Sequence, residues 1–375
     1  MIKVFNVISD TNIGGAGKCL LTYLEYADRS KFDITVVLPE GSLLKPHLKK
    51  LCVKLIEINA MSDQSLDWQA VKKLTAIFKK ERPDIVHSHA SMSARIAARR
   101  AHAKIIYTRH SVFPPSPRIS KGIGKKVNGI INNHYADGII AVAEAAKQNL
   151  TDTGVDAAKI RVILNGVKPM RVLDDAAKAE ARKTFGVYPG ETVISIVARL
   201  NPVKGHEYFL RAAKKELDSG IKAKFIIAGT GEILGRLRQL SLELGIDEKL
   251  CFAGFIEDVT PLMNITDIQV NASYGTEATS LSLLEGMSLG IPAVVSDFGG
   301  NPGVITNGEN GLITPQKDAD ALADALIRLC RDEALMQQMH SRAKAIFDER
   351  FKAEVMSKNI EAFYTEILQS GGNEK

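Results

Sequence analysis

Two glutamates eight positions apart bracket the predicted start of a helix in the last third of the chain. Glu277 lies in the loop before the helix. Glu285 lies within its apolar pattern, where a carboxylate is costly unless it binds something. The backbone amides of Ser280, Leu281 and Ser282 would lie at the helix N-terminus, which favours an anion. Taken alone, the segment would indicate only a capped helix with an exposed glutamate.

A pair of cations follows an earlier apolar run, the strand predicted at Val193–Val197. Arg199 and Lys204 would both lie at the mouth of a cleft, where two positive charges can neutralise a diphosphate. A glycine turn at Gly229–Gly231 follows the next predicted strand in the same cleft. The pattern indicates a site for a phosphorylated ligand in the second half of the chain.

A glycine-rich loop, Asp10–Gly17, follows the first predicted strand and precedes an apolar helical pattern. Gly14 and Gly15 would let the backbone approach a phosphate at the helix N-terminus, although tight packing explains them equally well. The loop lacks Gly-x-Gly-x-x-Gly and the Lys-Ser/Thr pair of a P-loop. Nicotinamide-dependent and P-loop functions are therefore disfavoured.

Histidines and paired aspartates are the candidate metal ligands. His87 and His89 lie at a predicted strand end, but no clustered cysteine or acid accompanies them, so polar lining of a cleft is the better interpretation. Asp318 and Asp320 form an Asp-x-Asp pair that opens a predicted helix, where acidic side chains favour the helix dipole. The sequence therefore predicts no metal site.

Alternating strands and helices must position these residues. Short Val/Ile-rich runs alternate with helical patterns over nearly all 375 residues, a length that suits two domains. Strands that are apolar throughout and separated by helices are typical of a parallel sheet covered on both faces. We therefore predict an α/β chain of two doubly wound Rossmann-like domains with a ligand cleft between the carboxyl ends of their strands.

The boundary between the domains is predicted at Asn165–Pro169, where turn residues end the last strand of the first half. The domains would span residues 1–168 and 169–351, and residues 352–375 would contain a final amphipathic helix that could dock on either. The predicted strands are 4–8, 34–37, 53–58, 85–87, 105–107, 139–142 and 162–164 in the first half, and 193–197, 225–227, 250–252, 268–270 and 293–295 in the second.

Composition limits the class of protein. With 45% hydrophobic and 25% charged residues, the chain is neither disordered nor collagen-like. Four scattered cysteines favour a reducing compartment over a disulfide framework. The first residues resemble a strand and not a signal peptide, and no apolar run reaches the roughly 20 residues of a membrane span. We expect a cytoplasmic protein that is either free or peripheral on the inner face of a membrane.

The net charge of +6 is unevenly distributed. Residues 1–170 carry 26 Lys and Arg against 14 Asp and Glu, whereas residues 171–375 carry 23 against 29. Residues 116–135 interleave basic and branched apolar side chains, a pattern that can lie at an anionic lipid surface. Three glycines weaken this stretch as a helix, which favours an ordinary domain helix or a mobile loop. Its basic residues are Arg118, Lys121, Lys125 and Lys126.

Together these motifs resemble the retaining GT-B fold glycosyltransferases of family 4, the glycosyl transferase group 1 type, which use nucleotide-sugar donors. The resemblance runs in family order over nearly all of residues 1–315. Its elements are Gly14–Gly15, Pro83–His89, Tyr107–His110, Asn165–Val167, Arg199 with Lys204–Gly205, Glu277–Glu285, Gly299–Pro302 and Asn310–Leu312. By this resemblance the final helix packs back on the first domain.

The resemblance implies a donor site. Arg199 and Lys204 would hold the diphosphate, joined by the Gly14–Gly15 backbone and the amides of residues 280–282. Glu285 would bind the ribose hydroxyls. In the same scheme, Glu277 would bind the hydroxyls of the transferred sugar, Phe255 and Ile256 would lie against the nucleobase, and His110 would lie beside the anomeric centre. The residues expected to be catalytic are His110, Glu277, Arg199 and Lys204.

The implied reaction transfers a hexose or N-acetylhexosamine, we expect from a UDP-sugar, to a hydroxyl of a glycan or lipid-linked glycan, as in cell-surface polysaccharide or glycolipid assembly. Fixed cations and amides would stabilise the leaving diphosphate. The acceptor would attack from the same face and pass its proton to a phosphate oxygen, so neither a metal nor a cofactor is expected. A membrane-proximal acceptor would account for the basic half.

Two positions depart from the family pattern. The usual Glu-Gly-Phe-Gly is here Glu277-Ala278-Thr279-Ser280, and Gly303 replaces the acidic residue that commonly follows Gly-Gly-x-Pro. Neither change removes a presumed phosphate or carboxylate contact, so we still expect activity. The first change would alter the sugar pocket.

Three other functions compete with this interpretation. A sugar-nucleotide 2-epimerase can share the fold, but the glutamate pair and the cation pair favour transfer. A non-catalytic sugar-nucleotide-binding protein remains open, because binding motifs do not distinguish it from an enzyme. Nucleic-acid binding is disfavoured, because aromatic residues make up 6% of the chain and are not gathered in the basic stretch.

Overall fold

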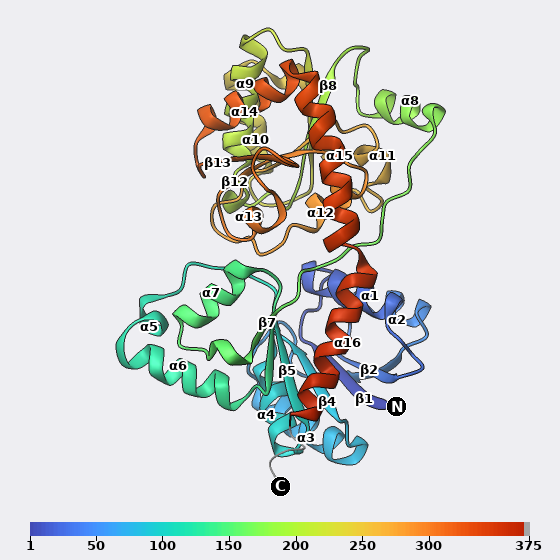
Figure 1. The fold of residues 1–375 in the computed structure, drawn as a ribbon, viewed down its shortest axis with the longest axis vertical. Helices are drawn as coiled ribbons and strands as arrows, with labels where there is room; N and C mark the ends of the chain where they lie inside the picture. The colour runs from blue at the N-terminus through green and yellow to red at the C-terminus, as the bar shows by residue number, and fades with distance from the viewer. Residues whose placement is uncertain (371–375) are drawn as a thin grey trace. The chain divides into compact units, whose positions relative to one another are not determined.

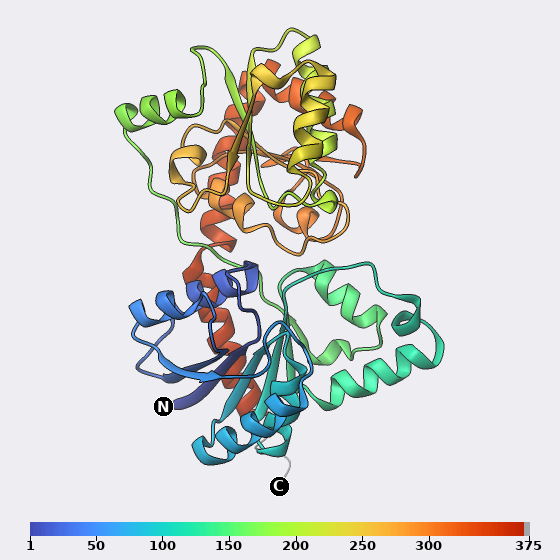
Figure 2. The ribbon, with the colours of Figure 1, turned by 180° about the vertical axis from the view of Figure 1, so that it is seen from behind.

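The computed structural model describes residues 1–370, which form two compact units. The first unit contains residues 1–166 and the C-terminal helix α16 (Ala353–Gln369), and the second contains residues 167–352. Each unit is built on one parallel sheet with helices against it (Figures 1 and 2). The α/β fold class predicted from alternating apolar runs and helical patterns is confirmed.

The first sheet has the strand order β3-β2-β1-β4-β5-β6-β7, and every neighbouring pair is parallel. This order, with crossovers running outward on both sides of β1 and β4, is the doubly wound arrangement. The strands are β1 (Ile2–Ile8), β2 (Phe32–Pro39), β3 (Lys54–Ile58), β4 (Ile85–His89), β5 (Lys104–Arg109), β6 (Gly138–Ala141) and β7 (Ile160–Val162).

Alternating side chains of β1 show how the first sheet is covered. Val4 and Ile8 pack into one apolar cluster with α1, α2 and α16, whereas Phe5 and Val7 pack into another with α3 and α4. Period-two alternation thus divides the core between the two faces. The helices of this unit before α16 are α1 (Gly15–Tyr26), α2 (Lys45–Lys50), α3 (Trp68–Glu81), α4 (Met92–Arg100), α5 (Pro117–Ser120), α6 (Gly122–His134), α7 (Glu144–Asp152) and the short η1 (Ala157–Lys159).

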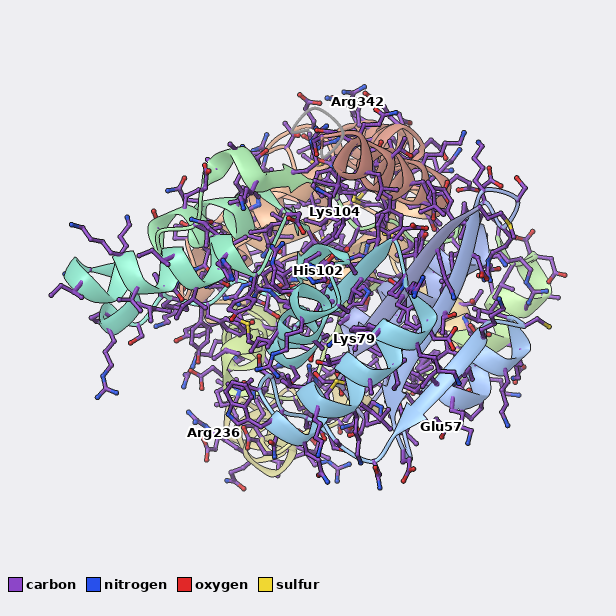
Figure 3. All side chains as sticks on the ribbon, turned by 90° about the horizontal axis from the view of Figure 1, so that it is seen from below. Glu57, Lys79, His102, Lys104, Arg236 and Arg342 are labelled. Atoms are coloured by element: carbon purple, nitrogen blue, oxygen red, sulfur yellow. The ribbon has the colours of Figure 1, made fainter. Side chains whose placement is uncertain are left out.

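Helix α16 is part of the first unit's core although it follows the second unit in the chain. Phe363, Tyr364 and Ile367 are buried in the cluster that includes α1, and each buried side chain of this size contributes about 1.5–3 kcal/mol relative to exposure. Figure 1 shows α16 lying along α1. Figure 3 views this unit from the side on which β5 begins, where His102 and Lys104 are labelled, so the carboxyl ends of the strands lie on the far side.

The second sheet has the order β10-β9-β8-β11-β12-β13 and is also parallel throughout. The sequence interpretation missed its edge strand β13, because the run is short and begins with glycine. Its core gathers residues of α9, α10 and α14 on one face. The strands are β8 (Thr192–Val197), β9 (Ala223–Ala228), β10 (Leu250–Gly254), β11 (Ile268–Asn271), β12 (Ala293–Ser296) and β13 (Gly311–Thr314).

Helices occupy most of the second unit after β13, as the sequence predicts beyond Pro315. Asp318 accepts a hydrogen bond from the Ala321 amide at 2.9 Å, so the Asp-x-Asp pair begins α14 as interpreted. The helices of this unit are α8 (Asp175–Thr184), η2 (Pro202–Lys204), α9 (His206–Asp218), α10 (Leu234–Leu244), η3 (Asp247–Lys249), α11 (Thr260–Met263), α12 (Leu281–Ser288), α13 (Asn301–Val304), α14 (Ala319–Arg331) and α15 (Glu333–Arg350).

The basic stretch after β5 forms the helices α5 and α6. Of the two structures expected for it, the ordinary domain helix is confirmed and the mobile loop is wrong. Two of its three glycines, Gly124 and Gly129, serve close packing. A Cβ on Gly129 would come within 2.2 Å of the Gly154 carbonyl oxygen, so only glycine lets α6 approach the turn after α7. Within residues 1–370, no helix is long and apolar enough to cross a membrane.

Candidate active site

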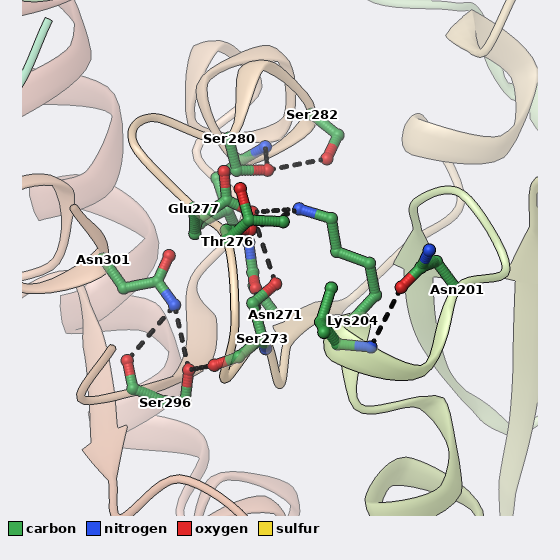
Figure 4. Close-up of polar contacts among 12 residues, drawn as sticks. Asn201, Lys204, Asn271, Ser273, Thr276, Glu277, Ser280, Ser282, Ser296 and Asn301 are labelled. Carbon is green, nitrogen blue, oxygen red and sulfur yellow. Dashed lines mark hydrogen bonds and ion pairs between the residues drawn. The ribbon is translucent and has the colours of Figure 1, made fainter. Parts of the chain in front are cut away.

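An ion pair joins two loops at the carboxyl edge of the second sheet. Lys204 ends η2, which follows β8, and its Nζ donates to Oε2 of Glu277 at 2.9 Å and to the carbonyl oxygen of Thr276 at 3.0 Å (Figure 4). Both side chains are largely buried, with 20% of Lys204 and 9% of Glu277 exposed. The structure therefore brings together the cation and the first of the two glutamates singled out in the sequence.

Polar side chains from the end of β11 hold the same carboxylate. Asn271 Nδ2 lies 3.1 Å and Ser273 Oγ lies 3.3 Å from Oε2 of Glu277. A carboxylate that accepts hydrogen bonds from a cation, an amide and a hydroxyl is charge-compensated and fixed in orientation. Sequence reasoning missed Asn271 and Ser273; the signal available was two polar residues directly after a buried apolar strand.

The backbone of Glu277 is held by the Gly299–Gly300 turn. The amide of Gly300 donates to the Glu277 carbonyl oxygen at 3.2 Å. Gly299 has φ of +62°, and a Cβ there would lie 2.1 Å from the same oxygen, so glycine is required for both reasons. Asn301, the next residue, is buried and donates to the Ser296 carbonyl oxygen at 3.2 Å, which anchors this turn on β12.

The first turn of α12 is tied to the end of β8. Ser280 caps the helix, with its Oγ 3.4 Å from the Leu283 amide. Ser282 Oγ lies 3.0 Å from Ser280 Oγ and donates to the Val197 carbonyl oxygen at 3.0 Å. Figure 4 shows Ser280 and Ser282 above Glu277 and Lys204. The N-terminal residues of a helix with its partial positive charge thus lie beside the ion pair.

The remaining donor-side residues differ in their exposure. Arg199 is exposed. Within residues 1–370, its guanidinium forms no hydrogen bond or ion pair. Glu285 is half-buried on α12. Phe255 is 76% exposed, whereas Ile256 packs against the apolar cluster around Val193. An exposed arginine and an exposed phenylalanine are available to a ligand.

In the first unit, three histidines meet because strands β4 and β5 lie side by side. The parallel register pairs His89 with Thr108, two residues before His110. His89 Nδ1 lies 2.9 Å from His110 Nε2, and the rings stack 5.2 Å apart. His87 and His89 also have their rings 4.4 Å apart. Of the two histidines interpreted as polar lining, His89 therefore contacts the one expected to be catalytic, and His87 contacts His89.

We call His87, His89 and His110 the histidine chain. Hydrogen bonds determine which ring nitrogens of His89 and His110 carry a proton. Asn6 Oδ1 lies 3.2 Å from His89 Nε2 and can only accept, so His89 donates there and its Nδ1 accepts from His110 Nε2. Nδ1 of His110 is then a lone-pair acceptor, and it is buried without a partner among residues 1–370. Burial lowers the pKa of His110 to about 4, which keeps the ring neutral at pH 7.

His87 connects the histidine chain to the C-terminal helix. Its Nδ1 lies 2.7 Å from the Tyr364 hydroxyl and its Nε2 lies 2.6 Å from Thr108 Oγ1. Burial, with a smaller effect of His110, lowers the pKa of His87 to about 3. The part of the chain that the structure describes contains no cluster of three or more His, Cys, Asp or Glu that could hold a metal ion.

The Gly14–Gly15 loop begins α1 at the carboxyl end of β1. Gly14 is the N-cap, no side chain caps the helix, and Gly15 is exposed with open space where a Cβ would be. Asp10 Oδ1 accepts from the Asn12 amide at 2.9 Å, which shapes the loop. Since β1 pairs with β4, with Ile8 opposite His89, this helix start and the histidine chain share one edge of the sheet.

Two parallel, doubly wound sheets of this kind define the GT-B class. The chain aligns with Anabaena HepE in complex with UDP-glucose at a TM-score of 0.84 and 23% identity, covering 98% of this chain and 100% of that one. A glycosyltransferase from Rickettsia africae gives a TM-score of 0.84 at 22% identity, covering 98% and 99%. These likenesses establish the fold.

The family follows from two models that match consecutive parts of the sequence. Residues 13–171 match the model described as Glycosyltransferase Family 4, and residues 177–346 match Glycosyl transferases group 1. The chain belongs to the family 4, group 1 glycosyltransferases, enzymes that transfer a sugar from a nucleotide sugar. The resemblance seen in the sequence is thereby confirmed.

Curated relatives extend over most of the chain. One is the UDP-Gal:alpha-D-GlcNAc-diphosphoundecaprenol alpha-1,3-galactosyltransferase of Escherichia coli, 28% identical over 346 residues and covering 89% of each chain. Another is the N-acetyl-alpha-D-glucosaminyl L-malate synthase of Bacillus anthracis, 25% identical and covering 82% of this chain and 81% of the relative. The sugars and acceptors in their names differ, so the family alone does not specify either substrate.

Proposed function

We propose that this glycosyltransferase transfers a hexose or N-acetylhexosamine from a UDP-sugar, with retention, to a hydroxyl of a glycan or lipid-linked glycan. The observation that carries the proposal is the Lys204–Glu277 pair beside the first turn of α12. The UDP-Gal donor of the Escherichia coli relative and the UDP-glucose bound to HepE support uracil as the base. Retention rests on the family resemblance.

Lys204 is the central diphosphate ligand in this proposal. An ammonium group has three donors, and two of them are used by Glu277 and Thr276. The third remains for a phosphate oxygen. The first-turn amides of α12 and the exposed Arg199 would add positive charge where the leaving group develops negative charge, which lowers the barrier to departure.

Glu277 has two roles in the proposal. It holds the Lys204 ammonium in place, and it presents a carboxylate to the hydroxyls of the transferred sugar. The amide of Asn271 and the hydroxyl of Ser273 fix that carboxylate, so it need not reorganise when the sugar binds. Glu285, four residues into the helix that begins at Leu281, would bind the ribose hydroxyls, and Phe255 with Ile256 would contact the base.

His110 would contribute a neutral ring. Its unpartnered Nδ1 can accept a hydrogen bond from a sugar hydroxyl, and its depressed pKa excludes the imidazolium form at neutral pH. Together with the Gly14–Gly15 backbone, it would form the first unit's contribution to the donor site. The acceptor proton would pass to a phosphate oxygen of the leaving group, so no protein nucleophile is required.

We propose that the acceptor is presented at an anionic membrane surface that α5 and α6 contact. Arg118, Lys121 and Lys126 are exposed and Lys125 is half-buried. On the same helix α6, Ile123 is 81% and Ile130 is 69% exposed. Exposed branched apolar residues interleaved with cations suit the interface between lipid headgroups and acyl chains.

The most informative experiment is a thermal-shift screen of uridine and guanosine diphosphates and their sugars. A ligand that binds only the folded protein raises its apparent stability. UDP and one or more UDP-sugars should raise the melting temperature, and the shift should be lost in Lys204→Ala. A shift by GDP alone would contradict the choice of base. Turnover separates an enzyme from a binding protein, and sugar transfer to an acceptor separates a transferase from a 2-epimerase.

A further inference from the structure

A pocket of about 150 Å³ lies at the carboxyl end of β5, next to the histidine chain in sequence but separate from it. At about 30 Å³ per molecule, it has room for about five waters. Arg109 lines this pocket, whereas the following residue, His110, lines another. Its polar lining consists of Tyr107, Arg109, Ser116, Asn128, Asn132, Asn149 and Thr153, with no acidic side chain among the described lining residues.

Arg109 is held in the pocket with a buried donor unused. Its Nη2 donates to Asn149 Oδ1 at 3.2 Å, and its guanidinium lies 5.2 Å from the centre of the Phe113 ring. Nε is buried and has no hydrogen-bond partner in the described part of the chain. Buried N–H groups of arginine are ordinarily paired, so an unpaired one marks a position for an acceptor group.

A second guanidinium lies behind the pocket wall. Arg95 is 3% exposed, and its donors reach only neutral acceptors: the Tyr135 carbonyl oxygen at 2.8 Å, and Oδ1 and the carbonyl oxygen of Asn132. It also stacks 4.6 Å from the ring centre of Tyr107, which lines the pocket. Neither Arg95 nor Arg109 forms an ion pair among residues 1–370. Two cations that no carboxylate compensates create a positive potential in a concave site.

We propose that this pocket binds a phosphate group of the acceptor, with Arg109 as its principal ligand. The identification of the acceptor as the molecule that carries the phosphate rests on the proposed function. The anion site itself rests on the geometry of the pocket. Arg109 and His110 are consecutive, with Cα atoms about 3.8 Å apart, and their side chains line pockets on alternate faces of the sheet. A phosphate bound by Arg109 therefore lies at the same carboxyl edge of the sheet as the proposed reaction centre. Ile119 lines the pocket and is also 40% exposed on the α5–α6 surface. The pocket can therefore be reached from that surface, either by the phosphate of a lipid or by a soluble phosphate ester.

Titration of inorganic phosphate into the full chain carrying Lys204→Ala tests the anion site by calorimetry, because that background removes the main cation of the other site. One saturable site is expected, with affinity reduced at least tenfold by adding Arg109→Gln and unchanged by adding Arg100→Gln, an exposed arginine on α4. Equal phosphate affinity with and without the Arg109→Gln substitution would overturn the proposal.

A second variant guards against a folding defect in Arg109→Gln. Ser116 is the exposed N-cap of α5 and lines the pocket; aspartate is an equally good N-cap and would introduce a negative charge. Ser116→Asp should therefore keep the melting temperature and weaken phosphate binding at least tenfold. Undiminished binding in a folded Ser116→Asp protein would contradict the pocket as the site.

Two arms distinguish the source of the phosphate. In flotation with phosphatidylcholine vesicles containing phosphatidylglycerol, loss of binding in Arg109→Gln indicates a lipid phosphate. Retained flotation, combined with a tenfold rise in KM for a soluble phosphorylated acceptor and unchanged kcat, indicates a soluble ester. If neither flotation nor KM changes, no acceptor phosphate occupies the pocket. Failure of UDP binding would defeat the proposed function without affecting the calorimetric result.

Discussion

The ammonium of Lys204 lies 2.9 Å from a carboxylate oxygen of Glu277, although the two residues are 73 positions apart. Each comes from a loop at the carboxyl edge of the second sheet, and each has further partners that fix it there. The pair explains how a lysine and a glutamate can be largely buried: each compensates the charge of the other. It also means that changing either residue disturbs both.

Glu277→Ala should lower kcat/KM by at least about 100-fold, a loss typical of removing one preorganised polar contact to the transition state. It should also reduce the free energy of unfolding by roughly 1–3 kcal/mol, because Lys204 and Asn271 lose their partner. Steady-state kinetics and urea denaturation measure the two effects. Glu277→Gln, which keeps the shape and an acceptor oxygen, should recover most of the stability but little of the activity; full recovery of activity would contradict a role for the charge.

Gly299→Ala and Gly303→Ala form a matched pair of glycine substitutions four residues apart. Gly299 has φ of +62° and no room for a Cβ beside the Glu277 carbonyl oxygen, whereas Gly303 lies in α13 with open space around it. Gly299→Ala should destabilise the protein and lower kcat/KM by displacing Glu277. Gly303→Ala should be neutral or stabilising by up to about 1 kcal/mol. Similar melting temperatures and activities for both would show that the turn does not position Glu277.

His89→Ala should lower kcat while leaving UDP binding within about twofold of wild type. The variant removes the partner of His110 Nε2, so the ring of His110 loses its orientation and tautomer. Lys204 and α12, which are proposed to bind the diphosphate, belong to the other unit and are untouched. A parallel loss of UDP affinity would instead indicate that His89→Ala acts through general misfolding.

Stability should fall between pH 6.5 and pH 4. The folded protein holds His110 at a pKa of about 4 and His87 at about 3, below the unfolded value near 6.5. Above pH 6.5 both states are neutral and nothing is lost. Below it, the unfolded chain binds protons that the folded protein does not, which costs roughly 2 kcal/mol per histidine at pH 5. Urea denaturation at pH 7 and pH 5 measures this loss, which should shrink in His87→Gln; an equal loss would exclude His87 as a cause.

Salt-sensitive flotation with anionic vesicles should depend on the α6 face. Ile123→Asn with Ile130→Asn should reduce binding at low salt, since both side chains are largely exposed and would enter the lipid interface. Replacing exposed Leu242 on α10 by Asn is the matched control in the second unit. If the wild-type protein does not float with anionic vesicles at low salt, the membrane proposal is contradicted.

Apolar periodicity was enough to predict two doubly wound sheets, because buried parallel strands are apolar throughout and easy to recognise. It failed at β13, where only Leu312 and Ile313 of four residues are strongly apolar. It also undervalued α6, because helix propensity counts glycine as a penalty and does not register the close approach at Gly129.

The candidate site was predictable only in part. Spacing and strand-end position singled out Lys204 and Glu277, and the family resemblance singled out His110, but neither identified their partners. The contact between His89 and His110 arises from the register of β4 and β5, which no local pattern encodes. Asn271 and Ser273 contact Glu277 because the fold places the loop after β11 beside η2, and the sequence does not show this position.

The most direct measurement of the central claim is the rate of UDP release from UDP-glucose, UDP-galactose and UDP-N-acetylglucosamine by wild type, Lys204→Ala and Glu277→Ala. The account predicts release from one or more donors by wild type and a loss of at least about 100-fold in both variants. Unchanged rates in both variants, or no release from any donor by a folded wild-type protein, would contradict it.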